Sequence, residues 1–224
     1  MNAVARRRHA PQVDQSERAW WLRTLAILQS PRPVFAALRD DSVEASASRQ
    51  EPVLALVLLA GVGAVLASPA NGTLMDDFAI DGLTAAIIIF LQGCVYGTVV
   101  YWLAGGALFF VSEYLGSRGS YRRSRHVLAY ASVPLVLSLV VIWPVRLALY
   151  GEDVFRSGGR DAGLGDHVFA GFELAFVAWS VGLLVVGVRA VHGWTWGRAL
   201  AASALAVVLT AGLLALLRVI LRGA

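Results

Sequence analysis

The hydrophobic positions of this chain gather into long segments that hold almost no charge, and short polar connections separate these segments. A run of about 20 apolar residues is long enough to cross the hydrocarbon core of a bilayer as an α-helix. The pattern predicts five transmembrane helices, at residues 52–70, 83–111, 127–150, 168–188 and 199–217. We therefore expect an all-α integral membrane protein whose five-helix transmembrane domain covers residues 52–222.

The second of these segments is longer than a single crossing requires. An unbroken helix over the uncharged run from Gly82 to Ser112 would measure roughly 45 Å at about 1.5 Å per residue, whereas the hydrocarbon core is about 30 Å thick. Two interpretations follow from this excess length. Either the helix projects into the cytoplasm, or it breaks near Gly105 and Gly106.

The residues before the first span divide into a tail and an amphipathic region. Residues 1–18 are basic and polar, and they are predicted to form a disordered cytoplasmic tail. Residues 19–51 are predicted to hold short interfacial helices and a connector. Trp21, Leu25 and Leu28 are spaced as one apolar helical face. Because tryptophan favours the headgroup level of a bilayer, this helix is expected either to lie in the membrane interface or to pack as a cap under the bundle.

A second short helix is predicted directly after the first. Ser30 is a suitable helix cap, and Pro31 is tolerated in the first turn, where a backbone N–H has no helical partner. Val34, Phe35 and Leu38 then supply a second short apolar face. The pattern places both helices ahead of the first membrane span.

The composition is that of a membrane protein rather than a soluble domain. Hydrophobic residues make up 58% of the chain and charged residues only 15%, against about 25% charged in a typical soluble domain. All 19 basic residues are arginine, and the abundance of alanine, glycine, valine and leucine indicates a GC-rich bacterial origin. The arginines lie mostly at the borders of the spans. Membrane topology explains that placement, so no nucleic-acid partner is predicted.

The arginine distribution also predicts the topology. A basic cluster at residues 118–125 leads directly into the third span, and the loop 112–126 and the turn 189–198 are basic. The loop 69–82 is acidic, and the loop 151–167 is mostly acidic. Because arginine-rich loops stay in the cytoplasm, we expect a multi-pass protein of the bacterial inner membrane with a cytoplasmic N-terminus and a C-terminus outside.

Two charged residues lie inside the predicted spans, Arg146 in the third and Glu173 in the fourth. Consecutive antiparallel helices would place both residues at a similar depth, slightly below the outer surface. Charges at this depth are costly, so they usually form a pair or line a wet cavity. The two alternatives are a structural salt bridge and a proton or ion site.

Gly93 and Gly97 in the second span form a GxxxG motif. Small residues at this spacing let two helix backbones approach closely. We expect the motif to pack the second span against another helix of the same bundle. A homodimer interface formed by this motif is the alternative.

Pro134 and Pro144 both lie in the third span. Each proline removes one backbone N–H donor and disturbs the helical turn before it. A fixed kink is the predicted consequence. The alternative is that the freed carbonyl groups coordinate an ion or accept hydrogen bonds from neighbouring side chains such as Tyr130 and Ser132.

No pattern in the sequence indicates catalysis. Cys94 is the only cysteine, and the four histidines lie in different segments without metal-ligand spacing. No HExxH, GxSxG or P-loop pattern occurs. We therefore expect a protein that is not an enzyme and that has no catalytic residue, no cofactor and no metal site.

Three stretches of the sequence carry a family resemblance. WWLRTLAILQSPRPVFAAL holds a P-x-x-x-F motif at Pro31 and Phe35, and RRSRHVLAYASVPLVL leads from basic residues into a Y-x-x-x-P motif at Tyr130 and Pro134. RAVHGWTWGRALAAS joins the last two spans by a short tryptophan-bearing turn. In their order and spacing these stretches resemble the Yip family, five-span proteins named for interaction with Ypt/Rab GTPases. The resemblance implies a five-helix membrane protein without known catalytic residues.

The bacterial members of that family look like scaffolds or accessory subunits, and we interpret this chain as one that organises other membrane components. Its partners would be the lipid bilayer and other integral membrane proteins, such as those of a transporter complex. The interaction surface is predicted at the cytoplasmic face, where its arginines would also contact anionic headgroups. It consists of Trp20, Trp21, Pro31, Phe35, Arg118, Arg122, Arg123 and Arg125. The alternative function is a small-solute or ion transporter subunit that uses Arg146 and Glu173.

Overall fold

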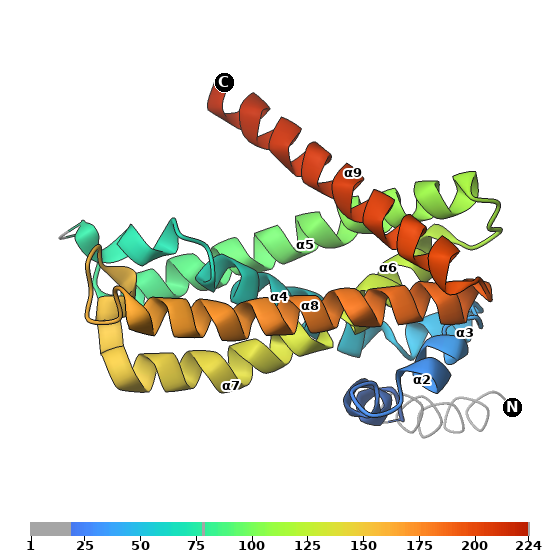
Figure 1. Cartoon of the computed structure of the whole chain (residues 1–224), viewed down its shortest axis with the longest axis horizontal. Coiled ribbons are helices and arrows are strands. Elements are labelled where there is room, and N and C mark those ends of the chain that lie inside the picture. The colour runs from blue at the N-terminus through green and yellow to red at the C-terminus, as the bar shows by residue number, and fades with distance from the viewer. Residues whose placement is uncertain (1–18, 78, 224) are drawn as a thin grey trace, which may run out of the picture.

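The computed structural model describes residues 19–77 and 79–223 (Figure 1). Within these residues every regular element is a helix and no strand occurs. Five stretches of helix are long and apolar enough to cross a membrane. This confirms the predicted all-α membrane fold. The predicted disordered tail, residues 1–18, lies outside the described residues.

The third span is divided into two helices, whereas each of the others is a single helix. The helices are α4 (Gln50–Leu66), α5 (Gly82–Tyr114), α6 (Tyr121–Ala131) with α7 (Val133–Tyr150), α8 (Leu164–His192) and α9 (Trp196–Gly223). α4 ends ahead of the predicted boundary at residue 70. The later spans are longer than predicted, because polar residues at their ends continue the helices.

Shorter helices lie at the two ends of the bundle. Residues 19–26 are helical, and α2 (Pro31–Ala37) and α3 (Val43–Ala47) precede α4. The 3-10 helices η2 (Asn71–Asp76) and η3 (Gly151–Phe155) lie in the connections at the opposite end. The short elements thus cover both ends of the long helices (Figure 1).

The two ends differ in charge, and we name them accordingly. The basic end comprises residues 19–49, 112–126 and 189–198, where arginine outnumbers aspartate and glutamate. The acidic end comprises residues 69–81 and 147–168, where aspartate and glutamate outnumber arginine. The helices α4 to α8 connect one end to the other (Figure 1).

α5 is one unbroken helix of 33 residues, which is roughly 50 Å long at about 1.5 Å per residue. Gly105 therefore does not break it. The side chain of Arg125 from α6 fills the space beside this glycine, so that its Cγ occupies the position that a Cβ would need. Of the two interpretations of the long second segment, the structure supports a helix that exceeds a hydrocarbon core of about 30 Å.

The third span is interrupted at Ser132, between α6 and α7. Pro134 follows in the first turn of α7, where its missing N–H needs no helical partner. The Ser132 N–H donates to the carbonyl of Leu128 at 3.0 Å and closes the last turn of α6. α7 then continues through Pro144 to its end. The interruption lies beside the first of the two prolines, and the second lies within a continuous helix.

The largest buried side chains gather at the basic end. Ile27, Phe35 and Leu38 from the N-terminal segments are fully buried, and they belong to one core cluster with Tyr130 and Val188. The N-terminal segments are therefore part of the protein core. This arrangement favours the cap under the bundle over a helix that contacts only lipid.

α9 leaves the bundle. It starts beside the basic end and diverges from the other helices toward its C-terminal end (Figure 1). Its first half packs through small or hydroxyl-bearing side chains that are buried, namely Ala199, Ala202, Ser203, Ala206 and Thr210. From residue 211 to residue 220 no described side chain is buried. We call residues 211–220 the free half of α9.

Candidate functional site

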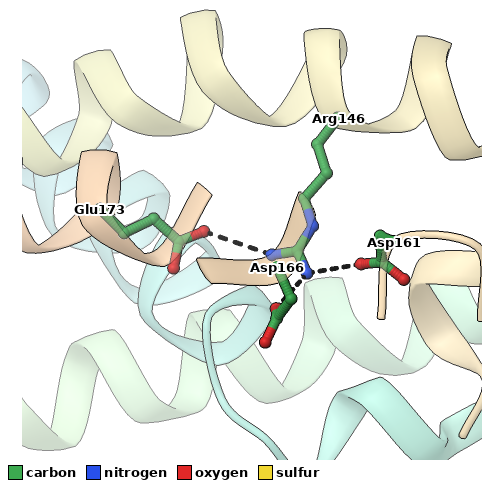
Figure 2. A network of polar contacts seen from close by, with 4 residues as sticks. All are labelled: Arg146, Asp161, Asp166 and Glu173. Atoms are coloured by element: carbon green, nitrogen blue, oxygen red, sulfur yellow. Dashed lines mark hydrogen bonds and ion pairs between the residues drawn. The ribbon is translucent and has the colours of Figure 1, made fainter. Parts of the chain in front are cut away.

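At the acidic end, one arginine gathers three carboxylates (Figure 2). Arg146 projects from α7, and its Nη2 lies 2.7 Å from Asp161 Oδ2 and 2.8 Å from Asp166 Oδ1. Its Nη1 lies 3.8 Å from Glu173 Oε1. The guanidinium also lies against the ring of Trp143, 5.2 Å from the ring centroid. The network thus joins α7, the connection after η3 and the first turns of α8.

The structure places Arg146 and Glu173 near each other, as the depth argument predicts, but the shorter contacts involve two other residues. Asp161 and Asp166 belong to the loop before α8 and to its first turn, and sequence reasoning counted them only as loop charges. Asp161 is buried, whereas the Asp166 side chain is 54% exposed. The network therefore extends from the interior of the bundle to its surface.

A reversal of the chain before α8 brings Asp161 and Asp166 together at Arg146. Gly163 has a φ of 93°, which is a left-handed conformation that glycine adopts without strain. It directly precedes α8, so the chain reverses there and brings Asp161 back toward Asp166, whose N–H donates to the Asp161 carbonyl at 2.7 Å. The glycines around residue 160 were the only signal in the sequence for this reversal.

The two connections at the acidic end, which contain η2 and η3, are also joined by hydrogen bonds. The N–H of Ser157 donates to Asp76 Oδ1 at 2.8 Å, and the Ser157 hydroxyl donates to Asp76 Oδ2. Arg156 Nη1 donates to the carbonyl of Met75 at 3.3 Å. The hydrogen bonds from Ser157 hold the pKa of the Asp76 carboxyl below its usual value. These contacts fasten the segment after η3 to η2.

At the basic end, arginines bind backbone carbonyl groups rather than carboxylates. Arg49 is fully buried, and its Nη2 donates to the Asp40 carbonyl at 2.8 Å. Arg39 Nε donates to the Ala190 carbonyl at 2.9 Å, and Arg123 Nη2 donates to the Arg39 carbonyl at 2.8 Å. These bonds tie the N-terminal segments to α6 and α8. The basic end is thus held together without losing its positive charge.

The predicted interaction surface is wrong at two residues, because their side chains lie in the core. Trp20 is 5% exposed and packs against the ring of Tyr130, with centroids 5.6 Å apart. Phe35 is completely buried and lies on Gly187 of α8, where a larger residue would collide with the ring. Neither side chain is accessible to a partner.

The apolar face predicted for residues 19–29 is not the face that packs against the bundle. Trp20, Thr24 and Ile27 face the bundle, whereas Trp21 and Leu25 are exposed. Both faces of this helix are rich in apolar residues, so spacing alone did not decide which one packs. The outward apolar side chains suit a position at the membrane interface.

The remaining members of the predicted surface lie outside the core. Arg118 and Arg122 are exposed, and Pro31, Arg123 and Arg125 are half-buried. These residues come from α2, from α6 and from the connection before it. Their side chains define the accessible part of the predicted surface together with Trp21.

Arg125 occupies an aromatic cage. Its guanidinium lies 3.9 Å from the ring centroid of Trp102, 4.7 Å from that of Tyr121 and 5.3 Å from that of Tyr101. No carboxylate of the described residues lies within salt-bridge distance of it. The stacked rings and the glycine under its stem, Gly105, therefore fix this positive charge at the basic end.

The GxxxG motif faces the interior of the bundle. Gly93 and Gly97 are buried, and a Cβ on either would collide with α4, at Val62 in the first case and at Val57 and Gly61 in the second. Close backbone approach of α4 and α5 therefore requires these glycines. α4 occupies this face, so it leaves no room there for a second copy of the chain.

The apolar helices and the short elements that cover their ends define a multi-pass membrane protein built around a helical bundle. The family model of the Yip1 domain matches residues 25–218, and the chain belongs to this family. The family predicted from the sequence is thereby confirmed. No curated protein and no solved structure matches the chain significantly.

The family motifs have structural positions in this fold. Phe35 packs on Gly187, Tyr130 packs on Trp20, and Pro134 starts α7 after the break. These three motif residues are buried, and the fourth, Pro31, is half-buried. The motifs that carry the resemblance therefore specify how the N-terminal segments pack against α6 and α8.

Proposed function

We propose that this Yip1-domain protein is a non-catalytic scaffold that organises other integral membrane proteins, and that the free half of α9 is its docking element. The observation that carries the proposal is the packing of α9. Its first half is buried against the bundle, whereas residues 211–220 have no buried side chain. The bundle closes without this segment, so the segment is available to a partner within the membrane.

The residues of the free half suit helix–helix contact. Ala211 and Ala215 are four residues apart, so they lie on one face of the helix, and both are exposed. Gly212 lies beside them, and a Cβ there would meet open space. Association of helices in a membrane depends on close packing and on small residues that allow it. A helix of a partner protein therefore fits against this face.

Site-specific photo-crosslinking in native membranes tests the docking element. A photoreactive residue at Leu216, on the free half, is expected to give a discrete adduct with another membrane protein. The matched control is a photoreactive residue at Phe90, which is 56% exposed on α5. Adducts with lipid alone at Leu216, or the same protein adduct from both positions, would contradict the proposal.

A pair of bulky substitutions makes this test specific. Gly212→Leu is expected to abolish the Leu216 adduct, because the larger side chain separates the two helices. Ala86→Leu is a small-to-large change on the exposed face of α5, and it should leave the adduct intact. An adduct that survives Gly212→Leu would place the contact elsewhere on the protein.

We also infer that the basic end faces the cytoplasm of a bacterial cell. The excess of arginine at that end supports this orientation. Cys94 lies within α5, so Cys94→Ala provides a background for single cysteines at Arg118 and Arg160, which are exposed at opposite ends. An impermeant thiol reagent added to intact cells should label only the cysteine at 160. Labelling of the cysteine at 118 alone would reverse the orientation.

Transport by way of Arg146 is the second candidate function. The observation in its favour is a buried cation surrounded by three carboxylates near the end of a span. An apolar cavity of about 300 Å³ lies between α4, α5, α6, α7 and α8, but none of these charged residues lines it. Flux of protons or small ions into proteoliposomes that is lost in Arg146→Gln with Glu173→Gln would favour transport. Absence of flux in the unmodified protein would remove this candidate.

A further inference from the structure

The basic end holds a pocket with one charged wall and one apolar wall. Its volume is about 530 Å³, and it lies between α3 and the start of α4 on one side and α5 and α6 on the other. Arg122 and Arg125 of α6 form the charged wall, and the imidazole of His126 lines the same side. Leu54 and Val57 of α4 belong to the apolar wall. An amphipathic ligand matches this division.

The charges in the pocket are not compensated by its lining. None of the residues that line it is an aspartate or a glutamate. Among the described residues neither Arg122 nor Arg125 forms a salt bridge. Two cations that face a cavity without an acidic partner favour an anionic ligand.

A buried polar side chain in the same lining points to the same conclusion. His126 is only 6% exposed, and its Nδ1 has no hydrogen-bond partner among the described residues. Arg125 Nε is also buried without a partner. Buried polar groups in folded proteins are nearly always hydrogen-bonded, so an unpaired atom beside a cavity indicates a bound group that completes it. The guanidinium groups of Arg122 and Arg125, which line the pocket, would donate to the oxygen atoms of a phosphate group.

The surroundings place the pocket at the level of a membrane surface. Trp102 and Tyr101 line it, and rings of this kind collect at the boundary between hydrocarbon and headgroups. Below them, Leu54 is 56% exposed, so the apolar wall is open toward the membrane along α4. A lipid chain can therefore leave the pocket directly into the hydrocarbon.

We propose that this pocket binds an anionic phospholipid, with the phosphate at Arg122, Arg125 and His126 and an acyl chain along Leu54 and Val57. The aromatic cage holds Arg125 in place before the lipid arrives, so little side-chain ordering is needed on binding. Exposed polar groups at the pocket mouth, such as Gln50, are placed to contact the rest of the headgroup. This site is independent of partner docking on α9.

The test measures phosphatidylglycerol binding to the full-length chain in a neutral detergent by native mass spectrometry. Arg122→Gln with Arg125→Gln should weaken binding about 30-fold, since each arginine near a lipid surface is worth ~1 kcal/mol and every 1.4 kcal/mol is tenfold. The matched control is Arg23→Gln with Arg32→Gln, which removes two exposed arginines of the basic end that do not line the pocket. This control should change the affinity less than about twofold. Equal weakening by both pairs would overturn the proposal, because it would mean general charge attraction.

A second variant keeps the test valid if the double substitution disturbs folding. Gln50→Glu preserves the shape of an exposed side chain and puts a negative charge at the pocket. It should weaken phosphatidylglycerol binding several-fold and leave thermal unfolding unchanged. Unchanged binding in this variant would contradict the proposed position of the headgroup.

Competition separates a lipid from a free phosphate compound. Glycerol 1-phosphate and inorganic phosphate at millimolar concentration should not displace the lipid, because they lack the chain that contacts α4. Displacement by either one would show that the pocket takes a soluble phosphate compound, and it would overturn the assignment to a lipid.

Discussion

The two ends of the bundle hold their arginine side chains by different kinds of contact. At the acidic end, Arg146 is surrounded by carboxylates. At the basic end, Arg39, Arg49 and Arg123 donate to backbone carbonyl groups, and Arg125 stacks on aromatic rings. Carbonyl groups and rings carry no net charge, so these contacts hold the arginines in place and leave the basic end positive. The protein thus keeps a charge difference between its ends, because carboxylates surround the arginine at one end and uncharged groups contact the arginines at the other.

The ends also differ in what holds them together. The basic end is closed by large apolar side chains of the N-terminal cap, with Phe35 and Tyr130 at the centre. The acidic end is closed by ion pairs and hydrogen bonds between short connections. Substitutions in the apolar cap should therefore cost more stability than substitutions in the polar connections.

The largest effect is expected from Phe35→Ala at the basic end. The side chain is fully buried against Gly187, and removal of a buried phenylalanine costs about 3–5 kcal/mol. The free energy of unfolding, measured by equilibrium denaturation in mixed detergent micelles, should fall by this amount. Trp21→Ala is the matched control, because this aromatic side chain is 42% exposed on the adjacent helix, and it should change stability by no more than about 0.5 kcal/mol. Equal losses in both variants would mean that the outward face of the cap is also packed.

An intermediate effect is expected at the acidic end from Arg146→Gln. This variant leaves three carboxylates facing one another without a cation, and breaking a buried ion pair costs about 3–5 kcal/mol at most. Because Asp166 is largely exposed and water can solvate it, part of that cost is relieved, and we expect a loss near the lower limit. The same denaturation experiment measures it.

The partners of Arg146 provide the comparison within the network. Asp161→Asn should also destabilise the fold clearly, because the carboxylate is buried with the guanidinium. Asp166→Asn should cost less than about 1 kcal/mol, as exposed ion pairs do. Similar losses for Asp161→Asn and Asp166→Asn would show that burial does not set the strength of these contacts.

The long spans could be predicted from the sequence because membrane burial acts on whole segments. An uncharged run of sufficient length has few alternatives to a helix in a bilayer. The positions of the helix ends were harder to predict from the sequence. α6 begins at Tyr121, whereas the predicted span begins at residue 127, because Arg122 to His126 are too polar to count as membrane residues. The helix starts earlier since Ser120 caps it by accepting the Arg123 N–H at 3.0 Å.

The sites required information that the sequence pattern does not hold. Whether Trp20 or Trp21 faces the bundle depends on the shape of the surface below, where Tyr130 offers a ring for contact. The partners of Arg146 depend on a reversal at Gly163 that brings Asp161 back to the bundle. Intramembrane charge predicted the location of this network, but only the fold of the connection decided which carboxylates belong to it.

The smallest effect is expected from Asp76→Asn, which affects only the contact between η2 and the segment after η3. Asp76 is exposed and accepts two hydrogen bonds from Ser157. These bonds lower the pKa of the carboxyl, so their contribution is complete above the ordinary aspartate value of about 3.9 and is lost as the pH falls through the lowered value. Hydrogen exchange at residues 153–159, corrected for the intrinsic rate, should accelerate a few-fold in the variant at pH 6. In the unmodified protein the same acceleration should appear only at strongly acidic pH, and acceleration already at pH 5 would mean that another group holds this connection.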